Sequence, residues 1–140
     1  MNGFLLDTNV VSELTRDAPS THVIEFLANH DDLWLPSIVI HELEYGLRLL
    51  PSGRRQARLT AVVSSITSVY EDRILTLDRI GAEWSARFRA QARRSGHILD
   101  LGDALIAGTA RANNLAIATR NVADFRYVAV DVFNPWDPRP

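Results

Sequence analysis

The chain has 140 residues, a formal net charge of −2 and no cysteine. A chain of this length forms one domain and buries roughly two-thirds of the surface that its unfolded form exposes. The absence of cysteine excludes disulfides, thiolate metal sites and a thiol nucleophile. We expect a single domain over residues 1–136, followed by a short C-terminal tail over residues 137–140.

All fifteen basic residues are arginines, so the chain contains no lysine. This excludes mechanisms that need a lysine amine: the phosphate-binding P-loop, Schiff-base chemistry and nucleases of the carboxylate-plus-lysine type. No apolar run approaches the ~20 residues of a membrane span, and the N-terminus lacks the pattern of a signal peptide. We therefore expect a cytoplasmic protein that does not associate with a membrane.

The first predicted element is a short apolar strand that begins at Gly3 and ends at Asp7. A buried strand of a parallel sheet has this form when it delivers a carboxylate to the edge where ligands of α/β proteins bind. A helix is predicted over residues 9–14, with Thr8 or Asn9 as its N-cap. The next expected elements are a helix at residues 22–29 and a strand at residues 33–36.

The helix predicted from Ser37, its expected N-cap, to about Leu50 contains an unusual acid. A helical wheel places Glu42 inside an apolar stripe that includes Tyr45 and Leu49. An ionised carboxylate there costs several kcal/mol unless it is paired or bound to a metal ion. The alternative is a glutamate at the edge of the stripe, paired with an arginine.

Two more acids stand at predicted element boundaries in the C-terminal half. Asp100 fits an N-cap, whereas Asp103 lies in the first turn of the same helix, above a face of small residues. Asp124 follows a buried strand and has Thr119 and Asn121 as polar neighbours. The other elements predicted here are helices at residues 54–70 and 78–95, the latter ended by Gly96, and strands at residues 73–77, 115–119 and 128–133.

Alternating strands and helices predict a parallel sheet with right-handed crossovers, in which helices begin where strands end. This topology brings four acids to one edge: Asp7, Glu42, Asp103 and Asp124. Four carboxylates that lie close together repel each other and favour bound cations. The chain has no cysteine, and its histidines have no ligand spacing and are expected at the surface (His22, His30, His41 and His97). Mg²⁺ or Mn²⁺ is therefore favoured over Zn²⁺.

Metal-assisted hydrolysis of a phosphodiester is the reaction that suits such a site best. A metal-dependent phosphatase would use the same chemistry on a different substrate. The arginine-bearing helix at residues 78–95 has two interpretations as well. Charged helix faces of this kind are usually just solvated, and a basic rim that holds phosphates is the less common case.

Several segments resemble the PIN-domain family, and most closely the VapC/FitB-type toxins of bacterial type II toxin–antitoxin pairs. The similar segments are residues 5–14, 41–46, 50–55, 103–107, 118–125 and 134–136. Two positions depart from the family pattern, since the family more often has alanine at Gly108 and often has threonine at Val39.

The resemblance implies an α/β fold of three layers, α/β/α, around a central and mainly parallel sheet. It also implies a Mg²⁺- or Mn²⁺-dependent endoribonuclease that hydrolyses RNA, forms a homodimer and is neutralised by a small antitoxin protein. In this implied role Asp7, Glu42, Asp103 and Asp124 are the catalytic and metal-binding acids. Supporting polar groups would come from Thr8, Thr119 and Asn121. An alternative function is a binding protein that helps an antitoxin to repress its operator DNA, alone or in a larger toxin–antitoxin assembly.

Overall fold

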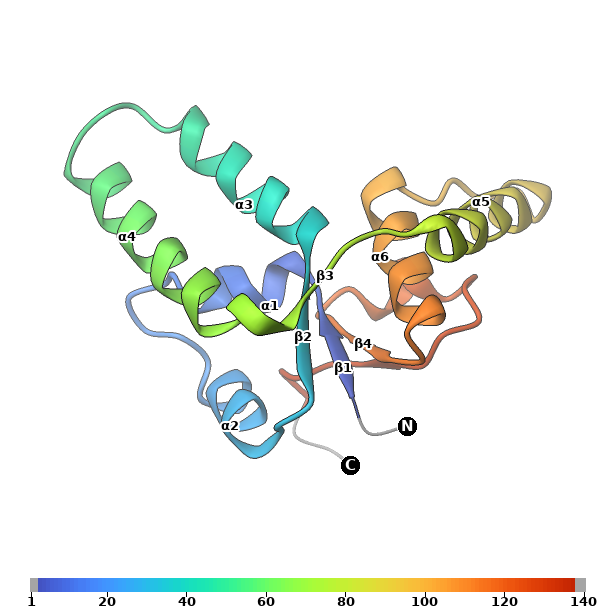
Figure 1. The fold of residues 1–140 in the computed structure, drawn as a ribbon, viewed down its shortest axis with the longest axis horizontal. Coiled ribbons are helices and arrows are strands. Elements are labelled where there is room, and N and C mark those ends of the chain that lie inside the picture. Colours follow the sequence, from blue (N-terminus) through green and yellow to red (C-terminus); the bar gives the residue numbers. More distant parts are fainter. Residues whose placement is uncertain (1–2, 138–140) are drawn as a thin grey trace.

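A computed structural model describes residues 3–137 and contains a five-stranded sheet between helices (Figure 1). The strand order is β3-β2-β1-β4-β5, and every neighbouring pair is parallel. Helices α3 and α4 extend on one side of the sheet and α5 and α6 on the other, which confirms the predicted three-layer α/β/α fold. The strands are β1 (Phe4–Leu6), β2 (Leu33–Pro36), β3 (Ile74–Leu75), β4 (Ala116–Ala118) and β5 (Val132–Phe133). The helices are α1 (Thr8–Glu13), α2 (Thr21–Asn29), α3 (Ser37–Leu49), α4 (Arg54–Val69), α5 (Arg79–Arg94) and α6 (Leu101–Ala112), with short 3₁₀ helices η1 (Glu71–Arg73) and η2 (Val122–Phe125).

Strand β1 occupies the centre of the sheet, which explains its continuous apolar sequence. Leu5 pairs with Trp34 of β2 on one side and with Ile117 of β4 on the other. A strand with neighbours on both edges and helices on both faces has no solvent-facing positions for polar residues. The Asp7 amide still donates a hydrogen bond to the Ala118 carbonyl at 3.0 Å, so the carboxylate stands where the strand leaves the sheet.

Two predicted helix caps are wrong, each by one or two residues. The N-cap of α1 is Asp7, whose Oδ1 accepts a hydrogen bond from the Thr8 amide at 2.8 Å, and not Thr8 or Asn9. Helix α3 already includes Ser37, and its N-cap is Pro36, which has no side-chain hydrogen bond to offer. An aspartate can cap a helix as well as a threonine or asparagine can, so composition alone did not distinguish these positions.

The two outer strands are much shorter than the sequence predicts. The strand expected over residues 73–77 pairs only at Ile74 and Leu75, and the strand expected over residues 128–133 only at Val132 and Phe133. After η2 the chain continues through a turn, in which the Val128 amide bonds to the Phe125 carbonyl. The part of this expected strand that precedes Val132 therefore packs on the core without joining the sheet. Residues 138–140 of the predicted tail lie outside the described residues.

Helix α6 leads into β4, so its first turn lies at the edge where the parallel strands end. It packs tightly on α5, where Ser85 Oγ donates to the Gly81 carbonyl at 2.9 Å. A methyl group at Gly108 of α6 would overlap that same Gly81 oxygen and the Ser85 hydroxyl. The glycine thus permits the two helix backbones to approach closely. Within residues 3–137 no helix combines the length and the hydrophobicity of a membrane span.

Replacing Gly108 with alanine should destabilise the fold by about 1–3 kcal/mol, because the added methyl group meets backbone that cannot move aside easily. Gly46 of α3 is a matched control, since no atom lies within 4 Å of the position that its methyl group would take. G46A should stabilise the protein by about 0.5–1 kcal/mol, the usual gain of alanine over glycine within a helix. Urea unfolding of both variants measures the difference, and equal stabilities would contradict the close α5–α6 packing.

Candidate active site

Asp7 is a buried carboxylate held by neutral hydrogen-bond donors. Its side chain is 6% exposed, and the fully buried Thr119 hydroxyl donates to its Oδ2 at 2.7 Å. The Thr8 amide donates to its Oδ1. Asn9 Nδ2 lies 3.4 Å from Asp7 Oδ2 and 3.2 Å from Thr119 Oγ1. Asn9 thus joins the end of β1 to the end of β4, a role that the sequence analysis missed by treating it only as a cap.

The loop that follows β4 is tied to the same group. The Asn121 amide donates to Thr119 Oγ1 at 3.1 Å, and the Arg120 amide donates to Asn9 Oδ1 at 3.2 Å. Asn121 therefore supports the site through its backbone, while its side chain is exposed. These bonds leave the Thr119 hydroxyl free to donate only to Asp7, which fixes the orientation of the carboxylate.

Glu42 occupies the second turn of α3, but not the buried face that the wheel predicts. The buried side chains of α3 are Val39, Leu43 and Leu47, whereas Glu42 is exposed. The predicted apolar stripe is displaced by one position from the face that is actually buried, because it includes Tyr45 and Leu49. These side chains are 60% and 66% exposed. The expectation that Glu42 is buried in an apolar stripe is therefore wrong.

Glu42 nevertheless reaches the first turn of α6 from across the edge of the sheet. A methyl group built at Gly102 would lie 3.6 Å from Glu42 Oε1 and 3.1 Å from Asp100 Oδ2. Gly102 directly precedes Asp103, so acids from α3 and α6 face each other here. No arginine pairs with Glu42 within residues 3–137, which also excludes the alternative of a paired glutamate at the edge of the stripe.

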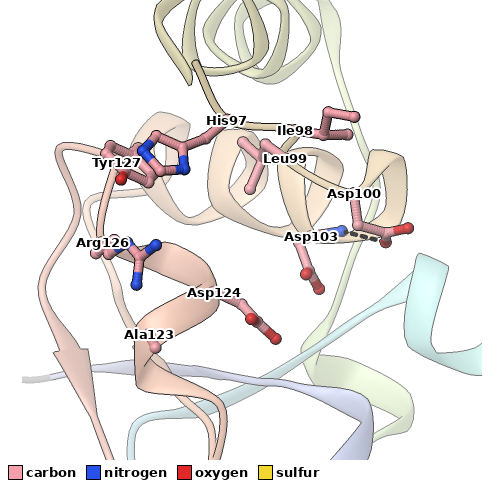
Figure 2. A pocket seen from close by; sticks show the side chains of 9 residues that line it. All are labelled: His97, Ile98, Leu99, Asp100, Asp103, Ala123, Asp124, Arg126 and Tyr127. Atoms are coloured by element: carbon pink, nitrogen blue, oxygen red, sulfur yellow. Dashed lines mark hydrogen bonds between the residues drawn. The ribbon is translucent and has the colours of Figure 1, made fainter. Parts of the chain in front are cut away.

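Asp103 and Asp124 line a cavity of about 250 Å³ together with Asp100 (Figure 2). The two carboxylates point into the same space, one from the first turn of α6 and the other from η2. Asp100 caps α6 as predicted, because its Oδ2 accepts a hydrogen bond from the Asp103 amide at 3.3 Å. It also contributes a fifth negative charge to the site, which the sequence analysis did not anticipate.

The electrostatics show that these acids share one site. Burial, followed by repulsion from Asp7, Asp100, Asp124 and Glu42, raises the pKa of Asp103 from its ordinary value of 3.8 to about 7. Burial makes the largest contribution to this shift, and the charges of the four neighbouring acids add to it. The four acids that the sequence places at one edge therefore do meet there, and Asp103 lies at their electrostatic centre.

The neighbouring acids respond in the same direction. Burial raises the pKa of Asp7, although hydrogen bonds from Thr119 and Thr8 oppose the change and the charge of Asp124 adds to it. Although Glu42 is exposed as a residue, partial burial of its carboxyl group raises the pKa of Glu42; the nearby Thr8 hydroxyl opposes this change and the charge of Asp7 adds to it. The Thr8 hydroxyl oxygen is buried and has no hydrogen-bond partner of good geometry among the described residues. An unused polar oxygen beside repelling carboxylates suits a hydrated cation.

The donor chemistry fits Mg²⁺ or Mn²⁺, which prefer carboxylate oxygens and retain several waters. None of the four acids forms an ion pair with an arginine within residues 3–137. The same residues include no set of three or more His, Asp or Glu side chains already arranged to hold an ion. A cation would therefore draw the carboxylates inward and keep water in the remaining positions.

The raised pKa of Asp103 predicts how stability depends on pH when divalent ions are absent. Between about pH 4 and pH 7 the folded protein binds a proton here that the unfolded chain does not, so stability falls as pH rises through this window. D103N removes this penalty and should be more stable than the unchanged protein at pH 7.5, by about 1–2 kcal/mol, with a smaller advantage at pH 5.

Thermal unfolding in EDTA at the two pH values measures this difference. D31N is the control, because Asp31 is an exposed aspartate distant in sequence from the site. An advantage of D103N that does not change with pH would show that the carboxyl group titrates normally.

Comparisons with known proteins agree with this fold. The PIN domain family matches residues 4–131. The toxin FitB of Neisseria gonorrhoeae is 36% identical, over 94% of this chain and 97% of that protein. The VapC ribonuclease Y4jK of Sinorhizobium fredii is 32% identical, over 96% and 98% of the two chains.

Solved structures give the same result. A structure of FitAB bound to a DNA fragment superposes with a TM-score of 0.90 and 34% identity, covering 98% of both chains. The crystal structure of FitAcB from Neisseria gonorrhoeae superposes with a TM-score of 0.87 and 36% identity, covering 95% of this chain and 98% of that one. The family match spans nearly all of the chain and these relatives cover it end to end, so this protein belongs to the PIN-domain family.

Proposed function

We propose that this protein is the toxin of a toxin–antitoxin pair and acts as a Mg²⁺- or Mn²⁺-dependent endoribonuclease. The observation that carries the proposal is that Asp7, Glu42 and Asp124 all act on the charge of Asp103 at one edge of the sheet, while none of these four acids forms an ion pair with an arginine within residues 3–137. Relatives over nearly the whole chain include a VapC ribonuclease and the toxin FitB. Uncompensated carboxylates suit a site that gains its positive charge from a metal ion.

In this proposal Asp7 and Asp103 are the principal ligands, and Asp124 and Glu42 complete the site. A bound divalent ion would lower the pKa of a coordinated water and offset charge on the phosphate that is attacked. The chain itself supplies orientation. The Thr119 hydroxyl and the Thr8 amide donate hydrogen bonds to the two oxygens of Asp7. These bonds fix the carboxylate in one orientation before a metal ion binds.

The direct test is cleavage of RNA by the purified protein, freed of antitoxin, in Mg²⁺ or Mn²⁺ and in EDTA. We expect cleavage only with the metal ion. Loss of a principal ligand removes several kcal/mol of stabilisation, so D7N and D103N should each lower the rate by about 100-fold or more. Cleavage that persists in EDTA, or in both variants, would refute the proposal. Equal activity on a small phosphate ester would favour a phosphatase.

Thr119 offers a finer test, because in this proposal it does not bind the metal ion but holds Asp7, which does. T119V keeps the shape of the side chain and removes the hydrogen bond to Asp7 Oδ2, together with the acceptor for the Asn9 side chain and the Asn121 amide, which should lower activity about 10- to 100-fold. Higher Mg²⁺ should restore part of this loss. T109V is the matched control, since Thr109 is equally buried and its hydroxyl bonds only to the Leu105 carbonyl of its own helix. An equal loss in both variants would mean a general effect on stability.

We also propose that the protein forms a homodimer, binds a cognate antitoxin and takes part in an assembly on operator DNA. The observation that favours this second role is the close likeness to FitAB bound to DNA. A DNA-bound VapBC from Salmonella typhimurium, with a TM-score of 0.82 and 29% identity, supports it as well. Binding to DNA does not require the acids, so unchanged toxicity of E42A in cells would make this the main role rather than RNA cleavage.

A further inference from the structure

The cavity that contains Asp103 and Asp124 has a second wall of quite different chemistry. His97 and Tyr127 lie against each other at the side of the cavity away from Asp100, and Arg126 lies between them and Asp124 (Figure 2). These residues come from two segments, the connection between α5 and α6 and the chain that follows η2. The sequence analysis expected His97 to be an ordinary surface group. It is exposed, but it faces the active-site cavity.

The two rings form a stacked pair. Their centroids are 4.3 Å apart and their planes differ by 26°, which is close to an offset stack. The guanidinium carbon of Arg126 lies 5.0 Å from the centre of the Tyr127 ring. Such a group of aromatic faces and a guanidinium is the kind of surface on which proteins bind the unstacked bases of single-stranded RNA.

The backbone holds His97 in place although its side chain is exposed. Helix α5 ends at Arg94, and Gly96 follows its C-cap Ser95 with a φ of +84°, a conformation that glycine adopts readily. The Gly96 amide bonds to the Arg93 carbonyl at 3.0 Å and the His97 amide to the Ala92 carbonyl at 2.9 Å. These are the two hydrogen bonds of a Schellman motif, so His97 leaves the helix in a fixed direction toward the cavity.

The positive charges near this wall are not neutralised by ion pairs within the described residues. Within residues 3–137 Arg126 forms no ion pair, although Asp124 stands two residues before it. A second cavity, of about 220 Å³, shares residues 97–99 with the first and is lined by Arg89 and Arg93, which have no ion pair in the described part of the chain either. By contrast, Arg79 of the same helix pairs with Glu83 at 3.2 Å.

We propose that the cavity containing Asp103 and Asp124 is a nucleotide-binding subsite for the RNA strand beside the cleaved bond, a proposal that rests on the proposed ribonuclease function. A base stacks on the exposed side of the His97 ring, which Tyr127 supports from its other side, and Arg126 binds an adjoining phosphate. The strand then passes residues 97–99 toward Arg89 and Arg93. The acids cannot attract RNA by themselves, since they repel its phosphates. Unpaired arginines next to the acids would hold the flanking phosphates and leave the central one to the metal ion.

RNA binding can be measured without cleavage in the D103N protein, by fluorescence anisotropy with a short single-stranded RNA over a series of salt concentrations. Adding H97A should weaken binding roughly tenfold, the effect of losing one stacked base. Adding R126Q should lower the slope of log affinity against log salt by about 0.7, the value for one phosphate contact on a single strand. R94Q is the control, because Arg94 lies at the same end of α5 but lines neither cavity. It should change neither quantity.

An RNA that lacks one base tests the contact itself. Once the wild-type cleavage site is mapped, the base on either side of it is removed in turn. When the removed base is the one that contacts the protein, the abasic RNA should bind as weakly as the intact RNA binds to the H97A protein. Adding H97A should then cause no further loss of affinity for that abasic RNA. Fully additive losses at both positions would overturn the subsite.

Three other outcomes are informative. If the wild-type protein cleaves RNA but H97A and R126Q bind it normally, the subsite is refuted and the ribonuclease proposal stands. If the wild-type protein does not cleave RNA, the ribonuclease proposal itself fails. Loss of antitoxin binding by H97A, with RNA affinity unchanged, would show that this wall receives the antitoxin instead and would also overturn the subsite.

Discussion

The mutual repulsion of acids at one edge of the sheet is the constraint on which this site depends. The fold places Asp103 among Asp7, Asp100, Asp124 and Glu42, and their combined charge with burial raises the pKa of Asp103 to about 7. Folding brings these charges together without an arginine to offset them within the described residues. Such an arrangement costs stability unless a cation binds. This cost is the physical reason for which we propose a bound divalent cation.

A comparison with Glu13 shows that burial alone does not mark a functional acid. Glu13 is only 4% exposed, and burial by itself would raise its pKa. Hydrogen bonds from the Ser20 amide at 2.7 Å and from Arg16 at 3.1 Å outweigh burial and hold the pKa of Glu13 below its ordinary value. Asp7 is equally buried, but its donors are neutral and its charged neighbours are acids. The missing countercharge, rather than the burial, distinguishes the site.

The sequence predicts well those features that follow from topology. Asp7 and Asp103 could be placed at one edge because a parallel sheet with crossover helices leaves little choice about where strands end and helices begin. It predicts poorly what depends on side-chain direction. The helical wheel placed Glu42 on a buried face because it counted Tyr45 and Leu49 as core, and hydrophobicity does not show which apolar residues a neighbouring element will cover. The contributions of Asn9 and His97 arise from contacts between distant segments, for which a single sequence carries no signal.

The close packing of α5 on α6 connects the acids to the ring-lined wall of the cavity. Gly108 lets α6 approach Gly81 and Ser85 of α5, so the two helices pack closely against each other. The connection between them carries His97 at one end and Asp100, the cap of α6, at the other. A shift of α5 relative to α6 would therefore displace the rings from the carboxylates. The same glycine contact that stabilises the fold thus sets the distance between the site of chemistry and the surface that we propose for the RNA base.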